Sequence, residues 1–415
     1  MPQNDGSQKF DVVISGVSFA GLALACALNQ ASDDGLTIAL IDRGASPDIA
    51  TEPDARASAL SAASKNLLNA LGAWPMIADA AQPVAAIEIT DSGLHAGVRP
   101  VLLTYDNVVG AGVPATYIVP NSVLHQALCS VAARMPSIKW IAGAEAQDFT
   151  TAETGVVVRL ADGAELHAGL LVAAEGRSSR LREAAGIKVV GWSYPQIGIV
   201  TTVRHELPHN ACAVQHFLPS GPFAILPLKG NRACITWTED AAEARRILAL
   251  DDVAFLGEIE KRFGGRLGAI GLDGPRQSWP LKMHLARRYV GPRFALVGDS
   301  AHGVHPLAGQ GLNLAFRDVA ALTEVVAEGV RLGFDAGDAQ ALARYERWRR
   351  FDSFVLAAAF DGLNRLFASD LTLMRAARDV GLGLVDRAPV LKRLFVSEAA
   401  GLTGDLPRLL KGEAV

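Results

Sequence analysis

The N-terminal part of the chain predicts a strand, a helix and a second strand in the order of a βαβ unit. The apolar runs from Phe10 to Ser15 and from Leu36 to Ile41 are typical of buried strands, and Leu22 to Gln30 between them is typical of a helix. Two strands joined by a helical crossover lie parallel in one sheet. A chain of 415 residues is long enough to cover such a sheet and bury a large core. The sequence therefore predicts an α/β fold.

The turn inside this unit carries an imperfect dinucleotide-binding fingerprint. Gly16 suits the tight turn, Gly21 suits close packing of the helix on the strand, and Asp42 at the end of the second strand can accept hydrogen bonds from ribose hydroxyls. Ser18 replaces the middle glycine, so a Cβ lies where backbone approaches pyrophosphate, although the hydroxyl can donate to a phosphate. The predicted contacts of this motif are Gly16, Ser18, Ala20, Gly21, Asp42 and Arg43.

A second glycine-rich segment runs from Gly298 to Asp318. It follows the apolar run Pro292 to Val297 and leads into a helical pattern from Leu312 to Val330. Asp299 can bind sugar hydroxyls, and the free N–H groups at the helix start can hold negative charge. The glycine spacing alone is equally typical of an ordinary strand-to-helix turn.

Together with a third segment, Leu170 to Arg182, these motifs resemble those of the class A flavoprotein monooxygenases, the aromatic hydroxylase group. In that group the third segment contains Asp-Gly and helps to bind FAD and the reduced nicotinamide. Here the corresponding pair is Glu175-Gly176, and the longer side chain displaces the carboxylate. Within the group, the chain is most similar to the ubiquinone-biosynthesis hydroxylases. That similarity rests on Gln215 to Leu228, His305 to Leu314, Tyr345 to Arg350 and Leu363 to Phe367, and it extends from Phe10 to Gly412.

The resemblance implies a discontinuous FAD-binding Rossmann-like domain with an inserted β-sheet substrate domain and a C-terminal helical region. We expect the FAD-binding domain at 1–80, 105–190 and 285–350, the substrate domain at 81–104 and 191–284, and the helical region at 351–415. Within this scheme Leu102 to Val113, which contains two glycines, is expected to be mostly loop.

The resemblance also implies roles for individual residues. Asp299 would bind the ribityl chain and Asp42 the adenosine ribose. Arg56 matches an arginine near the flavin, although it could instead pair with Asp54 or Glu52. The predicted flavin-edge loop, whose N–H groups would stabilise the reduced ring, consists of Pro306, Gly309, Gln310, Gly311, Leu312 and Asn313. The predicted substrate pocket consists of His216, Phe217, Phe223 and Trp237, which would equally suit an ordinary sheet core.

The histidines of the second segment do not predict a metal site. His302 and His305 have no carboxylate or cysteine at metal-ligand spacing beside them. We expect them to hold the loop by hydrogen bonds, with a role as the base that ionises a phenol as the alternative.

Composition excludes several other classes of protein. The net charge of −4, with no basic block, gives no indication of nucleic-acid binding. The four cysteines are scattered, which predicts neither a metal site nor a disulfide framework. The polar first residues and the lack of an apolar run of about 18 residues predict no signal peptide and no membrane span. We therefore expect a cytoplasmic protein that reaches a lipid substrate through peripheral contact at the inner face of the membrane.

One segment near the C-terminus could provide that contact. Pro389 to Val396 places Leu391, Leu394 and Phe395 on one helical face beside the basic pair Lys392-Arg393. The same face could instead pack on the cofactor domain or on a second subunit.

The leading functional hypothesis is an FAD-dependent monooxygenase that uses O2 to hydroxylate a polyprenylated phenol in ubiquinone biosynthesis. The alternatives are a non-catalytic flavin-binding or scaffold member of a biosynthetic assembly with other ubiquinone-biosynthesis proteins, and a hydroxylase of a soluble aromatic acid. The group implies NAD(P)H as the electron donor. A ferredoxin-type donor stays open because no second nucleotide fingerprint exists in the sequence.

Overall fold

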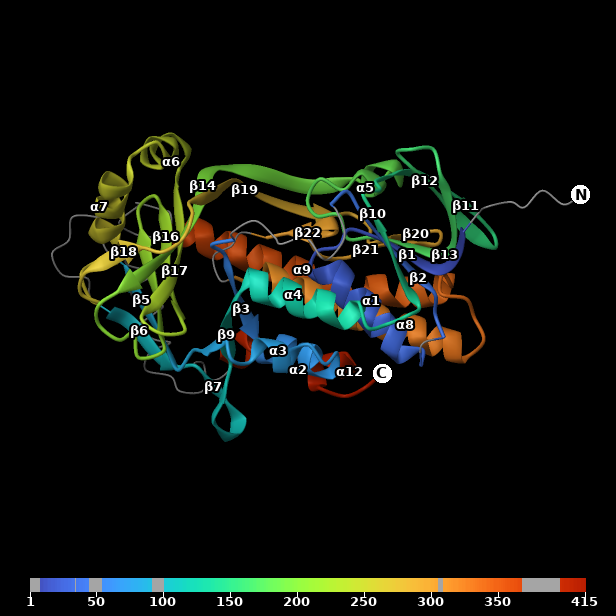
Figure 1. The fold of residues 1–415 in the computed structure, drawn as a ribbon, viewed down its shortest axis with the longest axis horizontal. Coiled ribbons are helices and arrows are strands. Elements are labelled where there is room, and N and C mark those ends of the chain that lie inside the picture. Colours follow the sequence, from blue (N-terminus) through green and yellow to red (C-terminus); the bar gives the residue numbers. More distant parts are fainter. Residues whose placement is uncertain (1–7, 34, 45–53, 92–100, 305–308, 368–395) are drawn as a thin grey trace, which may run out of the picture.

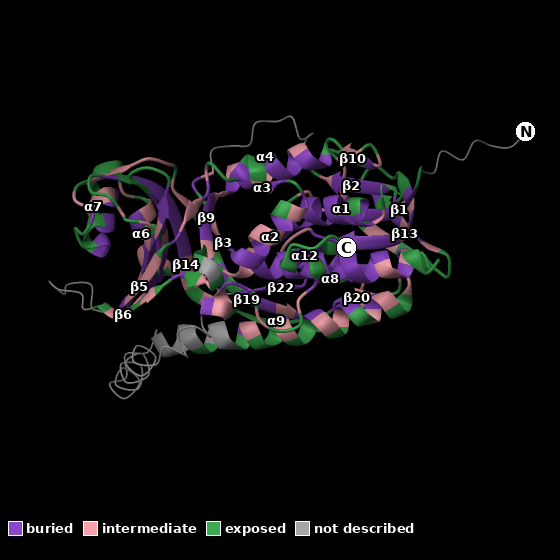
Figure 2. Ribbon diagram, turned by 90° about the horizontal axis from the view of Figure 1, so that it is seen from below, coloured by how far each residue is buried: buried purple, intermediate pink, exposed green. Residues whose placement is uncertain are grey.

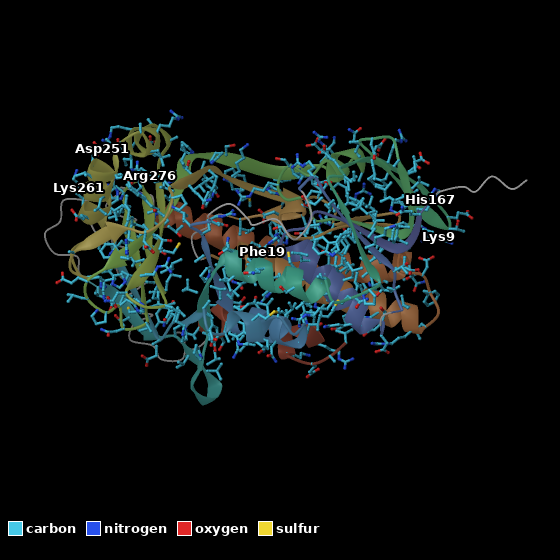
Figure 3. All side chains as sticks on the ribbon, viewed as in Figure 1. Lys9, Phe19, His167, Asp251, Lys261 and Arg276 are labelled. Carbon is cyan, nitrogen blue, oxygen red and sulfur yellow. The ribbon has the colours of Figure 1, made fainter. Side chains whose placement is uncertain are left out.

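The computed structural model describes residues 8–33, 35–44, 54–91, 101–304, 309–367 and 396–415. The described elements form two lobes, each built on its own sheet (Figure 1). Figure 3 marks their outer ends: Lys9 and His167 lie at the far end of one lobe, and Asp251, Lys261 and Arg276 at the far end of the other.

The first lobe contains a mainly parallel sheet in the order β10-β2-β1-β13-β12-β11, with β21 also paired to β13. Strand β1 lies parallel to both β2 and β13, as the predicted βαβ unit requires. The strands are β1 (Gln8–Ser15), β2 (Ile38–Asp42), β10 (Ile138–Ala142), β11 (Ala146–Ala152), β12 (Gly155–Leu160), β13 (Glu165–Ala173), β20 (Val290–Gly291) and β21 (Phe294–Leu296).

Helix α1 (Phe19–Ala31) packs closely on this sheet because Ala20 and Gly21 in its first turn are small. A Cβ on Gly21 would lie 1.9 Å from the carbonyl oxygen of Gly16, so this position admits only glycine. Gly16 has a φ of +108°, which also favours glycine. The two glycines of the first motif therefore have the packing roles that the sequence predicted.

Most other helices surround the same lobe. Helix α8 (Gly311–Arg331) is buried along most of its length, and α9 (Ala339–Phe367) runs along its outer side with exposed residues facing away (Figure 2). The remaining helices of this lobe are α2 (Ala62–Ala70), α3 (Trp74–Ile77), α4 (Asn121–Ala132), α5 (Arg180–Ala184) and α12 (Arg408–Lys411).

The second lobe contains a largely antiparallel sheet in the order β22-β19-β14-β17-β16-β15-β5-β6, with β18 paired to β14. Helices α6 (Ala241–Leu248) and α7 (Asp252–Phe263) contribute to the hydrophobic core on one side of it. The strands are β5 (Ala86–Asp91), β6 (Val101–Asp106), β14 (Val189–His205), β15 (Cys212–Leu218), β16 (Gly221–Leu228), β17 (Arg232–Asp240), β18 (Ile270–Leu272), β19 (Gln277–Ala286) and β22 (His302–Gly303).

Several short elements complete the described structure. They are β3 (Ala57–Ser61), β4 (Gln82–Pro83), β9 (Thr116–Pro120), the hairpin of β7 (Val108–Val109) and β8 (Val113–Pro114), and the short 3-10 helices η1 (Gly110–Gly112) and η2 (Gly298–Ser300).

The expectation of a loop over Leu102 to Val113 is wrong. Strand β6 occupies the first half and pairs antiparallel with β5, and β7, η1 and β8 form a hairpin over the second half. Gly110 and Gly112 belong to the tight turn of that hairpin and do not mark a longer loop. The predicted fold class is confirmed: an α/β cofactor lobe whose segments are interrupted by a β-sheet lobe, followed by helices. No helix among the described residues is long and apolar enough to cross a membrane.

Candidate active site

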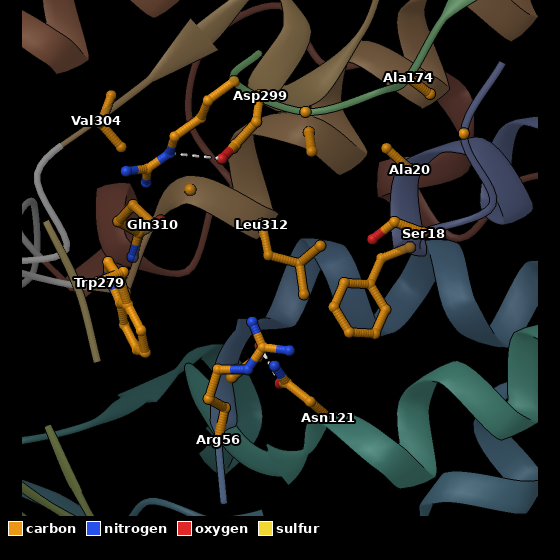
Figure 4. Close-up of a pocket in the computed structure, with 18 of the residues that line it drawn as sticks. Ser18, Ala20, Arg56, Asn121, Ala174, Trp279, Asp299, Val304, Gln310 and Leu312 are labelled. Carbon is orange, nitrogen blue, oxygen red and sulfur yellow. Dashed lines mark hydrogen bonds and ion pairs between the residues drawn. The ribbon is translucent and has the colours of Figure 1, made fainter. Parts of the chain in front are cut away.

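A cavity of about 1140 Å³ lies between the two lobes. It is lined by the first βα turn, the end of β13, the start of α8 and the inner face of the second sheet. Arg56 and Leu312 point into it from opposite sides, with Gln310 and Trp279 along one wall (Figure 4). Of the predicted site residues, the following line it: Gly16, Ser18, Ala20, Asp42, Arg43, Arg56, Glu175, Gly176, Asp299, Gly309, Gln310, Gly311 and Leu312.

The first glycine turn forms one end of the cavity and leaves a helix N-terminus open to it. Ser18 is the N-cap of α1, but its side chain makes no capping hydrogen bond. Its φ is −92°, so the backbone does not require the missing glycine. The unused hydroxyl and the first N–H groups of α1 are suitable donors for a phosphate.

Asp42 stabilises this turn as well as lining the cavity. One carboxylate oxygen accepts a hydrogen bond of 2.9 Å from the N–H of Val17, and the other accepts one of 2.7 Å from Gly44. Each carboxylate oxygen has a second lone pair that can accept from a sugar hydroxyl. Arg43 beside it is largely exposed and lies 3.6 Å from Glu145.

Glu175 lines the cavity, and its carboxylate is also held by hydrogen bonds within the protein. Its carboxylate accepts hydrogen bonds from Ser15 Oγ at 2.8 Å, from Ser179 Oγ at 2.7 Å and from the N–H of Leu181. The side chain therefore ties the end of β1 to the start of α5. Gly176 next to it has a φ of +81° and open space where a Cβ would lie.

Two arginines of the third segment contact the second glycine-rich segment, and the sequence interpretation did not identify them. Arg177 Nε lies 3.0 Å from Asp299 Oδ2, and Arg177 lines the cavity. Arg182 is buried and donates to the carbonyls of Ser300 and Arg177, which joins the third motif to the second. Both arginines lie within the segment Leu170 to Arg182, which resembles a family motif. Their place in that motif could have identified them as candidates.

Asp299 is held from several directions. Besides Arg177, the Nε2 atom of His284 lies 2.8 Å from the Asp299 carbonyl oxygen. Burial lowers the pKa of His284, although its contact with Asp299 opposes the shift. The Asp299 side chain is 40% exposed and remains accessible from the cavity.

The start of α8 opens into the cavity without a side-chain cap. Gln310 is the N-cap and makes no capping hydrogen bond, and a Cβ on Gly311 would meet nothing within 4 Å. Gly309 has a φ of +61°, which favours glycine. Pro306 and His305 lie outside the described residues.

Asn313 does not line the cavity. Its side-chain oxygen accepts from the N–H of Ser61 and from Ser64 Oγ, and its amide donates to the Ala59 carbonyl and to Gln310. The side chain is therefore committed to holding α8 against β3 and α2. Its backbone N–H, in the first turn of α8, is the part of Asn313 that can contribute to the helix N-terminus.

Arg56 both pairs with Asp54 and lines the cavity, the two possibilities that the sequence left open. It forms a two-pronged ion pair with Asp54, with contacts of 2.8 and 2.8 Å to the two carboxylate oxygens, and its guanidinium also lines the cavity. Hydrogen bonding to Asp54 raises the pKa of Arg56.

The four predicted substrate residues do not line the cavity, and that prediction is corrected. Phe223 and Trp237 are buried in the core beneath α6 and α7, and His216 stacks on Phe223 and contacts Thr90 Oγ1. Phe217 is also buried, and it is not among the residues that line the cavity. Side chains alternate between the faces of a strand, and the face turned to the cavity carries Ala213, Ala224, Leu226 and Thr236.

His302 is a structural histidine. Its Nε2 atom lies 2.6 Å from Asp318 Oδ2, and both side chains are fully buried. This confirms the expected hydrogen-bonding role for His302. Within the part of the chain that the structure describes, no group of three or more metal-ligating side chains is gathered.

The residues of the cavity fit a flavin dinucleotide. The N-termini of α1 and α8 both open into it without side-chain caps, and both can hold negative charge. Asp42 and Asp299 provide acceptors for sugar and ribityl hydroxyls. Gly176 and Gly311 leave space that a larger residue would fill.

Comparison with known proteins gives a consistent result. The chain matches the FAD binding domain family over residues 9–352. It is 42% identical over 407 residues to "Ubiquinone hydroxylase UbiL" of Rhodospirillum rubrum, covering 97% of this chain and 92% of that protein. It is 33% identical over 399 residues to "3-demethoxyubiquinol 3-hydroxylase" of Escherichia coli, covering 95% of this chain and 100% of that protein. Among solved structures, p-nitrophenol 4-monooxygenase from Pseudomonas putida superposes with a TM-score of 0.78 at 17% identity, over 96% of this chain and 99% of that one, which shows the shared fold.

Proposed function

The chain belongs to the FAD-dependent aromatic-ring monooxygenases of ubiquinone biosynthesis, and from this membership we propose that it hydroxylates the ring of a polyprenylated phenol with O2. The observation that carries the proposal is the shape of the cavity. The open N-terminus of α8 adjoins a wall of apolar side chains from the second sheet. An aromatic ring bound against that wall would lie beside the flavin.

When bound, FAD supplies the redox chemistry that activates O2 for transfer of one oxygen atom to an electron-rich ring. The chain's own contribution is placement and electrostatics. The unpaired N–H groups at the start of α8 would stabilise negative charge on the reduced flavin. The apolar wall would exclude water and hold the ring in position.

The apolar wall favours a lipid-like substrate over a soluble aromatic acid. It includes Ile87, Val200, Leu226 and Trp279, and the small side chains of Ala213 and Ala224 leave room for a ring. Several cations line the cavity, and Arg56, which points into it, is already paired with Asp54. A substrate carboxylate would have to compete with that pair.

We further propose that NAD(P)H donates the electrons and that the protein contacts the membrane surface peripherally to reach its substrate. Reduction of the bound flavin by NADH, NADPH or a reduced ferredoxin, compared under anaerobic conditions, tests the donor. Sedimentation with anionic and neutral liposomes tests the contact. Of the basic segment Pro389 to Val396 that motivated this contact, all but Val396 lies outside the described residues.

The proposed reaction is tested with the purified holoprotein. The protein should be yellow with one FAD per chain, and it should add one oxygen atom from 18O2 to a prenylated phenol recovered in lipid extract. In cells that lack the gene, mass spectrometry should show an accumulated quinone precursor that lacks one hydroxyl. FAD binding without labelled product from any prenylated phenol, and with no accumulated precursor, would instead support the scaffold hypothesis.

A further inference from the structure

One buried carboxylate, that of Asp318, binds a backbone N–H just before Asp299 and a side chain just after it. Its Oδ2 accepts a 3.0 Å hydrogen bond from the N–H of Gly298, the residue before Asp299. The same oxygen lies 2.6 Å from Nε2 of His302, three residues after Asp299. Because an ionised carboxylate can only accept, Nε2 of His302 carries the proton.

Helix α9 supplies the charge that keeps this carboxylate ionised. Arg349 Nε donates to Asp318 Oδ1 at 2.8 Å, and both side chains are almost completely buried. Burial opposes ionisation, but His302 and Arg349 outweigh it and lower the pKa of Asp318. Arg349 also binds Asp352, which in turn pairs with Arg317 on α8.

The same face of α9 holds the strand that leads to Asp299. Tyr345 Oη donates to the Leu296 carbonyl at 2.7 Å, and Glu346 accepts from the N–H of Tyr289 at 2.7 Å. Leu296 ends β21, and Tyr289 precedes the adjoining strand β20. Helix α9 therefore fixes both the strand and the turn that present Asp299 to the cavity.

We propose that Arg349 is a positioning residue for the cofactor, acting through Asp318 and His302 to set the position of Asp299. The inference rests on the proposed role of Asp299 toward the ribityl chain. Arg349 does not line the cavity. The alternative is that this cluster stabilises the fold and influences FAD only as any destabilising change would.

The test is a double-mutant cycle on the FAD dissociation constant, measured by flavin fluorescence on reconstituted protein. Arg349→Lys keeps the charge but loses the fixed geometry of the guanidinium. It should weaken FAD binding about 5- to 30-fold when Asp299 is present, and less than about threefold in an Asp299→Asn background, as expected for coupled residues. If Arg349→Lys weakens FAD binding by the same factor with Asp299 and with Asn at position 299, the proposal is wrong.

A matched control separates positioning from stability. Arg262→Lys makes the same substitution in another buried arginine, which pairs with Glu239 at 2.9 Å and Glu258 at 2.8 Å in the second lobe. It should lower the free energy of unfolding to a similar degree while leaving the FAD dissociation constant unchanged. If FAD affinity falls equally in Arg262→Lys, the effect follows stability and the proposal is wrong.

A second pair of variants applies if Arg349→Lys does not fold. His302→Leu removes the donor to Asp318 and should weaken FAD binding, whereas His302→Gln can restore a donor and should recover most of the affinity. No difference between the two variants would contradict the proposal. Failure of the wild-type protein to bind FAD would instead refute the proposed function itself.

Discussion

Asn313 shows how a residue can be essential to a site that its side chain does not touch. The family resemblance predicted a cofactor contact, yet both ends of the Asn313 amide bind β3, α2 or Gln310. The Glu175 carboxylate also has a structural role, since it holds β1 to α5, but Glu175 itself lines the cavity. At these positions the motif encodes the shape of the cavity, and the backbone and neighbouring residues would make the contacts.

Gly311 offers a clean test of where the cofactor lies. Gly311→Ala should raise the free energy of unfolding by up to about 1 kcal/mol, because alanine favours the helix more than glycine does. The new methyl group would project into open cavity space. We expect FAD affinity to fall about tenfold, equivalent to about 1.4 kcal/mol, measured by fluorescence titration. Unchanged affinity would show that the cofactor does not approach the start of α8.

Gly309→Val tests the flavin-edge loop less specifically than Gly311→Ala does, because it also strains the backbone. At a φ of +61° a β-branched residue is strained, and a Cβ would already lie 3.3 Å from Ala59. We expect this variant to lose stability in urea unfolding as well as catalysis. A variant with wild-type stability would mean that the backbone at Gly309 can relax without harm.

The ionisation of Glu258 should be visible in the acid stability of the second lobe. Burial opposes ionisation, but hydrogen bonds from Arg262, Lys261 and Arg246 lower the pKa of Glu258 to about 2, from 4.5. A carboxyl whose pKa is lower in the folded than in the unfolded protein stabilises the fold at pH values above the unfolded-state pKa. That contribution is lost as the pH falls toward the folded-state pKa. Glu258→Gln should therefore be less stable than wild type at pH 6, with the difference shrinking between pH 4.5 and 2.

Urea unfolding at a series of pH values measures this difference. Glu243→Gln is the control, because Glu243 also binds Arg246 but its side chain is 39% exposed. An exposed pair contributes little, so its difference from wild type should be small at every pH. If the difference in unfolding free energy between wild type and Glu258→Gln stays constant across this pH range, the pKa of Glu258 is not lowered in the folded protein.

At the scale of elements, the sequence predicted which segments form strands better than it predicted which way their side chains point. The βαβ unit, the strand before Gly298 and helix α8 follow from apolar periodicity and glycine position, and all appear in the structure. The face of β16 was not predictable, because its burial pattern is nearly continuous. One face packs under α6 and α7 and the other lines the cavity, so both are apolar and no alternation marks them.

Neighbouring residues of β16 test this assignment of faces. Ala224→Phe places a large ring in the cavity and should lower kcat/KM for the prenylated phenol at least about tenfold, with FAD affinity little changed. Ile225→Phe points to the opposite face and should lower stability by about 1–3 kcal/mol through overpacking. Its effect on KM should be small. The reverse pattern would show that the substrate binds on the helical side of the sheet.

At the scale of the whole molecule, the two lobes are built from segments that alternate along the chain and are not consecutive units. Strand β14 pairs with β17 at one end and with β19 along its length, and its register shifts between Ser193 and Ile197. The discontinuous arrangement could be inferred because two cofactor motifs far apart in the chain had to meet. The junction itself could not be inferred, since Trp279 and Val200 line the cavity without any motif around them.

The central position of β13 has a consequence for how the protein acquires its cofactor during biosynthesis. Strand β13 lies between β1 and β21, so the sheet that carries Gly16 and Asp299 stays incomplete until residue 296 has left the ribosome. The positioning helix α9 emerges later still. FAD should therefore load only onto nearly full-length chains, although its first binding motif is translated at the start. A stalled nascent chain ending at residue 290 should retain no FAD, whereas the released protein should.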